Sequence, residues 1–193
     1  FANYHPRVNV HFPGPGVGGH CIAVDPWFLV ELGGDAAQII HLSRNTNDSM
    51  PSYTAQQTQA ILNRNGIAGA TVAVLGLAFK GNVDDMRESP SLTILPELAK
   101  AGARLKIFDP EGRKEGEWRF EEIRDSIEFC DNEYDAIEES DAVMILTEWH
   151  VFRNLDLDRV KKISRGNFFF DFRNIYTPSE MEKRGFDYYS VGR

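Results

Sequence analysis

The chain has 193 residues, of which 42% are hydrophobic and 26% charged, as in an ordinary soluble globular protein. Its 21 basic and 29 acidic side chains give a formal net charge of -8, which argues against nucleic-acid binding through phosphate contacts. The 2 cysteines are too few for a disulfide framework and are not spaced as a metal site. No signal peptide or long apolar run is present, so we expect a cytoplasmic protein with no membrane segment and no metal.

Residues 1–66 are predicted to form a loop followed by helices. Residues 1–24 are rich in Gly, Pro, His and Asn and show neither helical nor alternating periodicity. Asp25, followed by a proline and an apolar run, is expected to be the N-cap of the first helix. Two further helices are expected over about 36–43 and 51–65, since the second range starts at a proline and is followed by a glycine.

Strands and helices alternate in the rest of the chain. Short apolar runs predict buried strands at 71–76, 105–108, 127–129, 142–146, 167–170 and 186–191. Helices are expected between them, at 90–100, 132–139, 156–162 and from 178 onward. This alternation indicates a parallel sheet. The predicted fold class is therefore α/β, with a helical and loop segment over 1–66 and a doubly wound, Rossmann-like domain over 67–193.

The segment 13–26, PGPGVGGHCIAVDP, carries the clearest chemical signal. Its glycines let the backbone approach a ligand closely and present N–H groups to it. Cys21 ends the glycine-rich stretch ahead of a helix N-terminus, whose partial positive charge favours the nucleophilic thiolate. Asp25, four residues on, is placed to orient water or take a proton. From chemistry alone, Cys21 as a small buried hydrophobe and Asp25 as a simple helix cap remain open.

A second segment, 75–90, has the sequence LGLAFKGNVDDMRESP and joins a predicted strand to a predicted helix. It therefore lies at the carboxyl edge of the sheet, where open α/β sheets bind ligands. It matches neither G-x-G-x-x-G nor a P-loop, and a solvated charged loop explains it equally well. Asp109 ends the next strand, where a Rossmann fold holds a ribose, but we prefer a structural turn formed with Pro110.

The two segments together resemble the UDP-glucose/GDP-mannose dehydrogenase family, and the His-Cys-Ile-Ala-Val-Asp-Pro-Trp-Phe form of the first is most like the members that act on UDP-N-acetylmannosamine. The resemblance implies NAD-dependent oxidation of a nucleotide sugar at C6, from alcohol to carboxylate. It makes Cys21 the nucleophile that forms a thiohemiacetal and then a thioester. It gives Asp25 the role of assisting water and proton transfer.

The resemblance also implies binding roles for residues outside the cysteine. Substrate contacts are expected from His5, Arg7, Gly18, Phe79 and Lys80, and an NAD contact from Arg87. In the family, an arginine from the segment around Arg7 reaches the substrate of the neighbouring subunit; a plain surface loop is the alternative there. Arg173 follows the Phe-rich strand at the ligand edge of the sheet, where a planar guanidinium suits a pyrophosphate or a uracil carbonyl.

The resemblance covers the whole chain but only about half of the family's pattern. The dense start of the sequence looks like a cut inside a longer chain. The Rossmann domain that holds the main NAD site precedes this part in the family, as do a catalytic lysine and asparagine, so we expect the isolated chain to be inactive. Residues 1–66 would supply the active-site loop and the central dimerisation helices, and 67–193 the UDP-sugar-binding domain. The expected partners are a UDP-sugar and a second copy, paired through 51–65 with Tyr53, Ile61 and Leu62 on or near the contact.

Two other functions explain part of the sequence. A UDP-sugar-binding module without catalysis accounts for the second segment, but binding alone needs no thiol at Cys21. A thiol-dependent aldehyde dehydrogenase accounts for that thiol but not for Lys80 or Arg173. Both alternatives explain less than a nucleotide-sugar dehydrogenase of polysaccharide biosynthesis.

Overall fold

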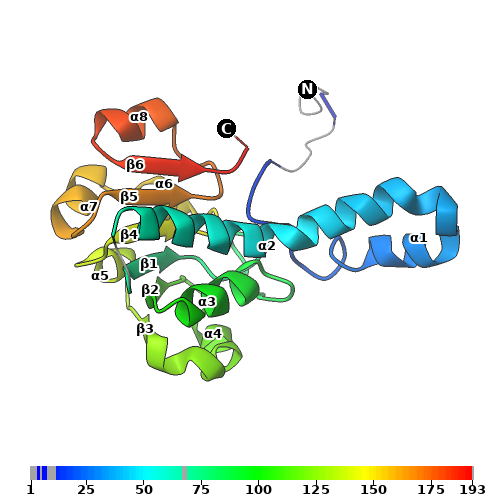
Figure 1. Ribbon diagram of the computed structural model, residues 1–193, viewed down its shortest axis with the longest axis horizontal. Coiled ribbons are helices and arrows are strands. Elements are labelled where there is room, and N and C mark those ends of the chain that lie inside the picture. The colour runs from blue at the N-terminus through cyan, green and yellow to red at the C-terminus, as the bar shows by residue number, and fades with distance from the viewer. Residues whose placement is uncertain (1–3, 5, 8–11, 67–68, 193) are drawn as a thin grey trace.

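The computed structural model describes residues 4, 6–7, 12–66 and 69–192, and in it two helices precede an open sheet (Figure 1). The helical part consists of α1 (Asp25–Gly33), the 3-10 turn η2 (Gly34–Ala37) and α2 (Gln38–Arg64). Within the described ranges, no helix is long and apolar enough to cross a membrane.

The sheet has six parallel strands in the order β3-β2-β1-β4-β5-β6. The strands are β1 (Thr71–Leu75), β2 (Arg104–Phe108), β3 (Ile127–Phe129), β4 (Ala142–Ile145), β5 (Phe168–Asp171) and β6 (Asp187–Ser190). The helices between them are α3 (Ser91–Lys100), α4 (Arg113–Arg119), η3 (Glu121–Ser126), α5 (Glu133–Ile137), α6 (His150–Arg153), α7 (Leu157–Ile163) and α8 (Pro178–Lys183). This strand order confirms the predicted doubly wound, Rossmann-like fold, and its chain reversal falls between β1 and β4.

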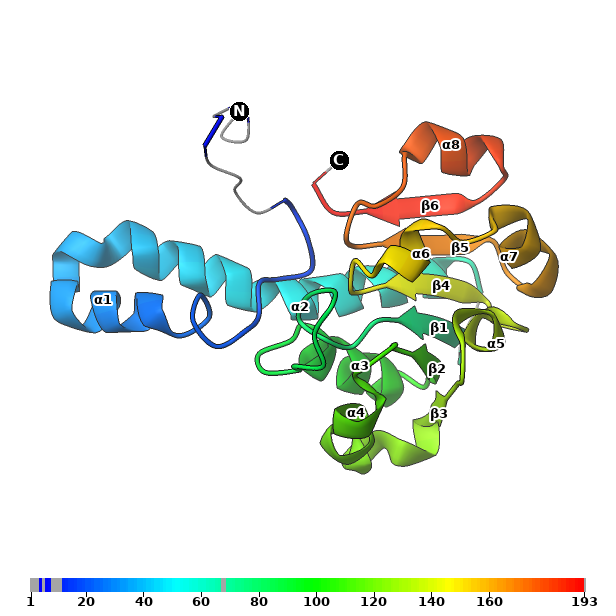
Figure 2. The same ribbon diagram turned by 180° about the vertical axis from the view of Figure 1, so that it is seen from behind.

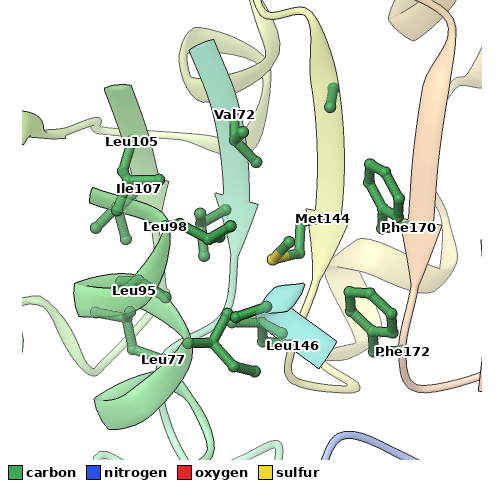
Figure 3. Close-up of a cluster of buried hydrophobic side chains, with 14 of the residues drawn as sticks. Val72, Leu77, Leu95, Leu98, Leu105, Ile107, Met144, Leu146, Phe170 and Phe172 are labelled. Atoms are coloured by element: carbon green, nitrogen blue, oxygen red, sulfur yellow. The ribbon is translucent and has the colours of Figure 1, made fainter. Parts of the chain in front are cut away.

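The central strands β1, β4 and β5 are buried on both faces, which is why they appear in the sequence as continuous apolar runs. One cluster joins alternate residues such as Val72, Met144 and Phe170 to α2 and α3, and Figure 3 shows part of it. The intervening residues, Val143 and Phe169 among them, pack with the helices of the opposite face. The helices therefore cover both sides of the sheet and leave its strand ends free to carry a site.

Helix α2 is one helix of 27 residues where the sequence predicted two, and Pro51 lies inside it. In the polar stretch before Pro51, Ser43 Oγ donates to the Ile39 carbonyl and Thr46 Oγ1 to the Leu42 carbonyl, both at 2.8 Å, so these hydroxyls satisfy themselves within the helix. Pro51 removes only one backbone hydrogen bond. Packing of the following turns on the sheet domain offsets that loss.

The two halves of α2 have different surroundings. The second half lies against the sheet domain, where Leu62 is 4% exposed and Gln59 Nε2 donates to the Glu97 carbonyl of α3 at 3.0 Å. The first half extends beyond the sheet beside α1, and these residues, 25–50, are called the helical arm below (Figures 1 and 2). Leu62 and the partly buried Ile61 thus belong to the chain's own core, which corrects their expected place at a subunit contact.

Candidate functional site

The loops after β1 and β4 are locked together at the point where the sheet changes direction. Gly76 has φ +99°, and a Cβ at this position would lie 2.4 Å from Cβ of Thr147. Thr147 Oγ1 donates to the Ala78 carbonyl at 2.6 Å. Only glycine permits this approach, and it fixes the start of the segment 76–90, called the β1 loop below.

Arg173 joins three strand ends at this edge. Its Nε donates to the Leu146 carbonyl at 2.6 Å and its Nη2 to the Phe79 carbonyl at 3.1 Å. Its Nε also lies 3.3 Å from Oε2 of Glu148, and its side chain is 15% exposed. Burial lowers the pKa of the guanidinium, and Glu148 opposes this effect. The sequence placed Arg173 at the ligand edge, and the structure adds Glu148 as its counter-charge.

Buried Asp171 fixes the backbone on which Arg173 stands. Its Oδ1 accepts from the Arg173 N–H at 3.1 Å, and its Oδ2 accepts from the Tyr176 N–H and from the Tyr188 hydroxyl, both at 2.8 Å. Burial raises the pKa of Asp171 although these bonds act against it. The arginine is therefore held in place before any ligand arrives.

A pocket of about 520 Å³ opens beside Arg173, between the sheet edge, α2 and the N-terminal glycine-rich loop. It is lined by Phe12, Pro13, Gly14, Gly16, Val17, Asn47, Met50, Glu148, Arg153, Arg173 and Val191. Its volume falls in the usual range for small-molecule and cofactor sites. Two guanidinium groups beside a glycine-rich backbone suit a phosphorylated ligand.

The glycine-rich segment, called the Cys21 loop (residues 13–24), lies directly against the β1 loop. The Gly19 N–H donates to the Arg87 carbonyl at 2.9 Å. A Cβ on Gly18 would lie 2.2 Å from the Glu88 carbonyl oxygen, and one on Gly19 2.9 Å from the Phe79 ring. The two segments that the sequence singled out are thus packed as one unit. Gly18 and Gly19 do not line the pocket, and the expected substrate contact of Gly18 remains a prediction.

Phe79 and Lys80 do not line the pocket in this structure. The Phe79 ring packs over Gly19. Lys80 is exposed, and its Nζ lies 5.4 Å from the centre of the Phe79 ring. Their expected substrate contacts remain predictions.

Cys21 is exposed at the end of its loop, whereas the other cysteine, Cys130, is buried and has a pKa raised to about 11, chiefly by desolvation. The Cys21 carbonyl accepts from the N–H groups of Val24 at 3.0 Å and Asp25 at 2.8 Å. Cys21 is therefore not a small core residue. This tight turn holds it just before the first turn of α1, at the positive end of the helix dipole.

Asp25 is the first residue of α1 rather than its N-cap, which is Val24 and makes no side-chain capping bond. The expected capping role is therefore wrong, because Cys21 and the residues after it already form a turn that runs into the helix. The Asp25 side chain is exposed near the thiol-bearing turn. The expected role of Asp25 in assisting water and proton transfer remains a prediction.

Arg87 lies between the two loops, 55% exposed. Its Nε and Nη2 bind the Asp85 carboxylate at 3.0 and 2.6 Å, and Nη2 also lies 3.3 Å from Nδ1 of His20. The hydrogen bond from Arg87 lowers the pKa of Asp85 to about 2. Asp85 chiefly raises the pKa of Arg87, and the Cys21 charge adds a weaker effect. The cation expected to contact NAD is thus in electrostatic reach of Cys21.

Asp109 has the structural role that we preferred. It is 4% exposed, and its carboxylate accepts from the N–H groups of Leu77 at 2.6 Å and Gly112 at 2.7 Å and from Trp149 Nε1 at 3.2 Å. These donors turn the carboxylate inward to brace the β1 loop. It is not available to a ribose.

The remaining predicted contacts lie near the start of the chain. His5 is outside the described residues, and Arg7 is exposed and does not line the pocket. In the part of the chain that the structure describes, no three His, Cys, Asp or Glu side chains gather as a metal site.

Sequence reasoning missed Asn47, Glu148 and Arg153 in the pocket. Glu148 follows β4. The reasoning that placed Arg173 at the carboxyl edge of the sheet, because it follows a strand, applies equally to Glu148. Asn47 and Arg153 lie on helices and carry no local signal, since only the tertiary fold brings them to the pocket.

Comparison with known proteins agrees with this architecture. Residues 73–178 match the UDP binding domain of the UDP-glucose/GDP-mannose dehydrogenase family, and residues 1–49 match its central domain. The chain is 38% identical over 188 residues to UDP-N-acetyl-D-mannosamine dehydrogenase of Methanococcus maripaludis, covering 96% of this chain and 41% of that protein. It is also 38% identical over 183 residues to UDP-glucose 6-dehydrogenase of Rhizobium meliloti, covering 93% and 41%.

A solved structure of the UDP-D-ManNAc dehydrogenase from Pyrococcus horikoshii aligns with a TM-score of 0.78 at 30% identity. The alignment covers 100% of this chain and 42% of that one. The chain thus spans about two fifths of the length of these relatives.

Proposed function

Because the chain belongs to the UDP-glucose/GDP-mannose dehydrogenase family, we propose that it is part of an NAD-dependent UDP-sugar 6-dehydrogenase and contributes the nucleophile and the UDP site. The observation that carries the proposal is that one continuous loop both lines the pocket beside Arg173 and ends at the exposed Cys21. A nucleotide held in the pocket would place its sugar toward the thiol.

UDP-N-acetylmannosamine is the proposed substrate. The motif His20-Cys21-Ile22 and the relatives from Methanococcus and Pyrococcus, whose names specify this sugar, support it. UDP-glucose is the second candidate, because the Rhizobium enzyme is equally similar. In this proposal the pocket beside Arg173 binds the nucleotide and not the sugar. The choice between the two sugars therefore rests on the motif and on the names of these relatives.

The residues of this chain have separate roles in the proposed reaction. Arg173 and Arg153 bind the diphosphate through charge-assisted hydrogen bonds. Cys21 attacks the C6 aldehyde and forms a thiohemiacetal, and after the second oxidation it carries the acyl group as a thioester. Asp25 assists the water that releases the carboxylate. NAD⁺, when bound, accepts the electrons of both oxidations.

Arg87 fits an NAD contact. Its side chain is 55% exposed, and its ion pair with Asp85 (20% exposed) is partly open to solvent, so a pyrophosphate can compete for the guanidinium. The main cofactor site is proposed to lie in the rest of the protein, so this chain alone would not support turnover.

The helical arm is the proposed contact with a second copy. The exposed apolar residues Phe28, Leu29, Leu32, Ile39 and Leu42 gather on α1 and the first half of α2, where α1 buries none of its residues. Tyr53, 52% exposed, lies within the expected 51–65 contact. Together they shift the proposed interface toward the start of α2.

The function is tested by thermal stabilisation of the purified chain. UDP is expected to raise the melting temperature, and small aldehydes are not, because the pocket recognises phosphate. NAD⁺ reduction by the chain alone is expected to be absent. Stabilisation by aldehydes instead of UDP, or steady NADH production, would contradict the proposal.

A further inference from the structure

Helix α2 holds the Cys21 loop at two points that the proposed chemistry does not use. Asn47 Oδ1 accepts from the Val17 N–H at 2.8 Å, and Asn47 Nδ2 donates to the Val17 carbonyl at 3.3 Å. Arg44 Nη1 donates to the Ile22 carbonyl at 3.4 Å. One contact lies four residues before Cys21 and the other one residue after it. The two side chains are three residues apart on α2 and so share a face.

Arg44 is an unusual residue for its place. Its side chain is 9% exposed on an otherwise exposed stretch of helix, and its Nε is buried without a hydrogen-bond partner. A buried cation with an unmade bond costs stability. Its charge is balanced by Asp48, whose Oδ1 lies 2.5 Å from Nη2 of Arg44 and 3.2 Å from Nδ2 of Asn47. One carboxylate therefore orients both side chains that hold the loop.

The loop has few side chains of its own that could anchor it to α2, because four of the residues 14–19 are glycines. Gly16 has φ +126°, and a Cβ there would lie 3.4 Å from the Pro51 ring, so the backbone passes close to the helix without side-chain packing of its own. Cys21 itself is exposed. In addition to the turn at the Cys21 carbonyl and the Gly19–Arg87 hydrogen bond, the bonds from α2 to Val17 and Ile22 fix the backbone on either side of the sulfur.

We propose that Arg44 and Asn47 are positioning residues for Cys21, acting through the Ile22 carbonyl and the Val17 peptide. Neither residue touches the sulfur. The idea builds on the proposed role of Cys21 as nucleophile, but the placement of the loop can be tested whether or not the protein is a dehydrogenase. Asn47 also lines the nucleotide pocket, so its loss should affect binding as well. Arg44 does not line this pocket, so the loss of Arg44 tests the positioning of the loop separately from nucleotide binding.

The first experiment measures amide hydrogen exchange of the purified chain in Arg44→Met and Asn47→Leu variants. Exchange in residues 17–24 is expected to accelerate at least about fivefold, with the larger effect for Asn47→Leu because its bonds are shorter, while the strands of the sheet stay unchanged. Arg64→Met, an exposed position at the end of the same helix, is the matched control. Exchange in the loop equal to wild type would overturn the proposal.

The second readout separates positioning from a merely structural role. Cys21 is already exposed, so a looser loop gains little access, but the thiol moves away from Arg87 and the start of α1. Iodoacetamide labelling of Cys21 at neutral pH is therefore expected to slow at least about threefold in Arg44→Met. Buried Cys130 stays unlabelled while the chain is folded. Arg44→Lys, which retains a charged donor, is expected to recover part of the rate. Unchanged labelling in a loop that exchanges faster would overturn the proposal.

In the full-length dehydrogenase, Arg44→Met is expected to lower kcat at least about tenfold, with KM for the UDP-sugar within about twofold of wild type. A rise in KM with unchanged kcat would contradict positioning of the nucleophile. If the wild-type protein oxidises no UDP-sugar, the proposed function fails, and the exchange and labelling results still decide the role of Arg44.

Discussion

Arg173 donates a hydrogen bond to the Phe79 carbonyl at 3.1 Å, and this bond joins the end of β5 to the β1 loop across a sequence separation of 94 residues. The same guanidinium bonds the Leu146 carbonyl after β4. The pocket wall is therefore braced by a residue that also offers charge to a ligand. Binding and stability are coupled at this position, and experiments on Arg173 must measure both.

Arg173→Met is expected to weaken UDP binding by about tenfold or more, because a charge-assisted hydrogen bond to phosphate is lost. Calorimetry with UDP measures this effect. Arg184→Met, at an exposed ion pair with Asp158 away from the pocket, is the control and should bind as wild type. Equal affinities for both variants would show that the nucleotide binds elsewhere.

Removing Arg173 should also destabilise the fold, by about 2–4 kcal/mol, because Glu148 is left with a buried oxygen and no counter-charge. The double variant Arg173→Met, Glu148→Gln is expected to recover part of this loss. Denaturant unfolding of the single and double variants gives the coupling. Purely additive effects would mean that the two side chains do not interact.

In the full-length parent, Cys21→Ala is expected to abolish four-electron turnover, with a loss on the order of a thousandfold or more, typical of deleting a covalent nucleophile. Cys21→Ser should still capture the aldehyde but hydrolyse its ester slowly. Mass spectrometry of the Ser variant, intact and after digestion, following incubation with substrate and NAD⁺, should find an acyl adduct of the nucleotide sugar, esterified through C6, at position 21. Near wild-type turnover by Cys21→Ala would make the thiol structural.

Arg87→Met is expected to raise the pKa of Asp85 from about 2 toward its ordinary value of 3.8, because the lowering comes chiefly from the Arg87 side chain. A carboxylate with a depressed pKa stabilises the fold above its unfolded pKa, and this contribution is lost as the pH falls through the folded pKa. The stability difference between wild type and variant should thus be constant above about pH 4 and shrink toward pH 2. NMR titration of the Asp85 carboxyl carbon measures the shift; an unmoved pKa would refute the pairing.

Leu32→Asp on the helical arm is expected to weaken association of two chains, since Leu32 is 86% exposed among other apolar side chains. Light scattering over a concentration series measures the change in mass. Glu31→Ala, a neighbouring exposed position on α1, is the control. If wild type and Leu32→Asp have the same mass at every concentration, the arm is not the contact in this chain.

The alternation of short apolar runs with helical stretches was sufficient to predict the parallel sheet and its doubly wound class. The reason is physical: strands buried on both faces must be apolar throughout, and parallel strands need crossover connections. The local glycine-rich context also made Cys21 a candidate nucleophile, and the family resemblance favoured that role, which stays a prediction. Features of this kind depend on neighbouring residues and are visible in one sequence.

Tertiary structure decided what depends on distant residues. Pro51 looked like a helix start, but packing of the following turns on α3 and the sheet carries α2 through it. Asn47 and Arg153 come to the pocket only because two helices meet the sheet edge there. The tight fit of Gly18 against Glu88 likewise joins two loops about 70 residues apart, a contact that no local propensity encodes. The local sequence indicated which residues are candidates for chemistry, and long-range packing determined where these residues lie.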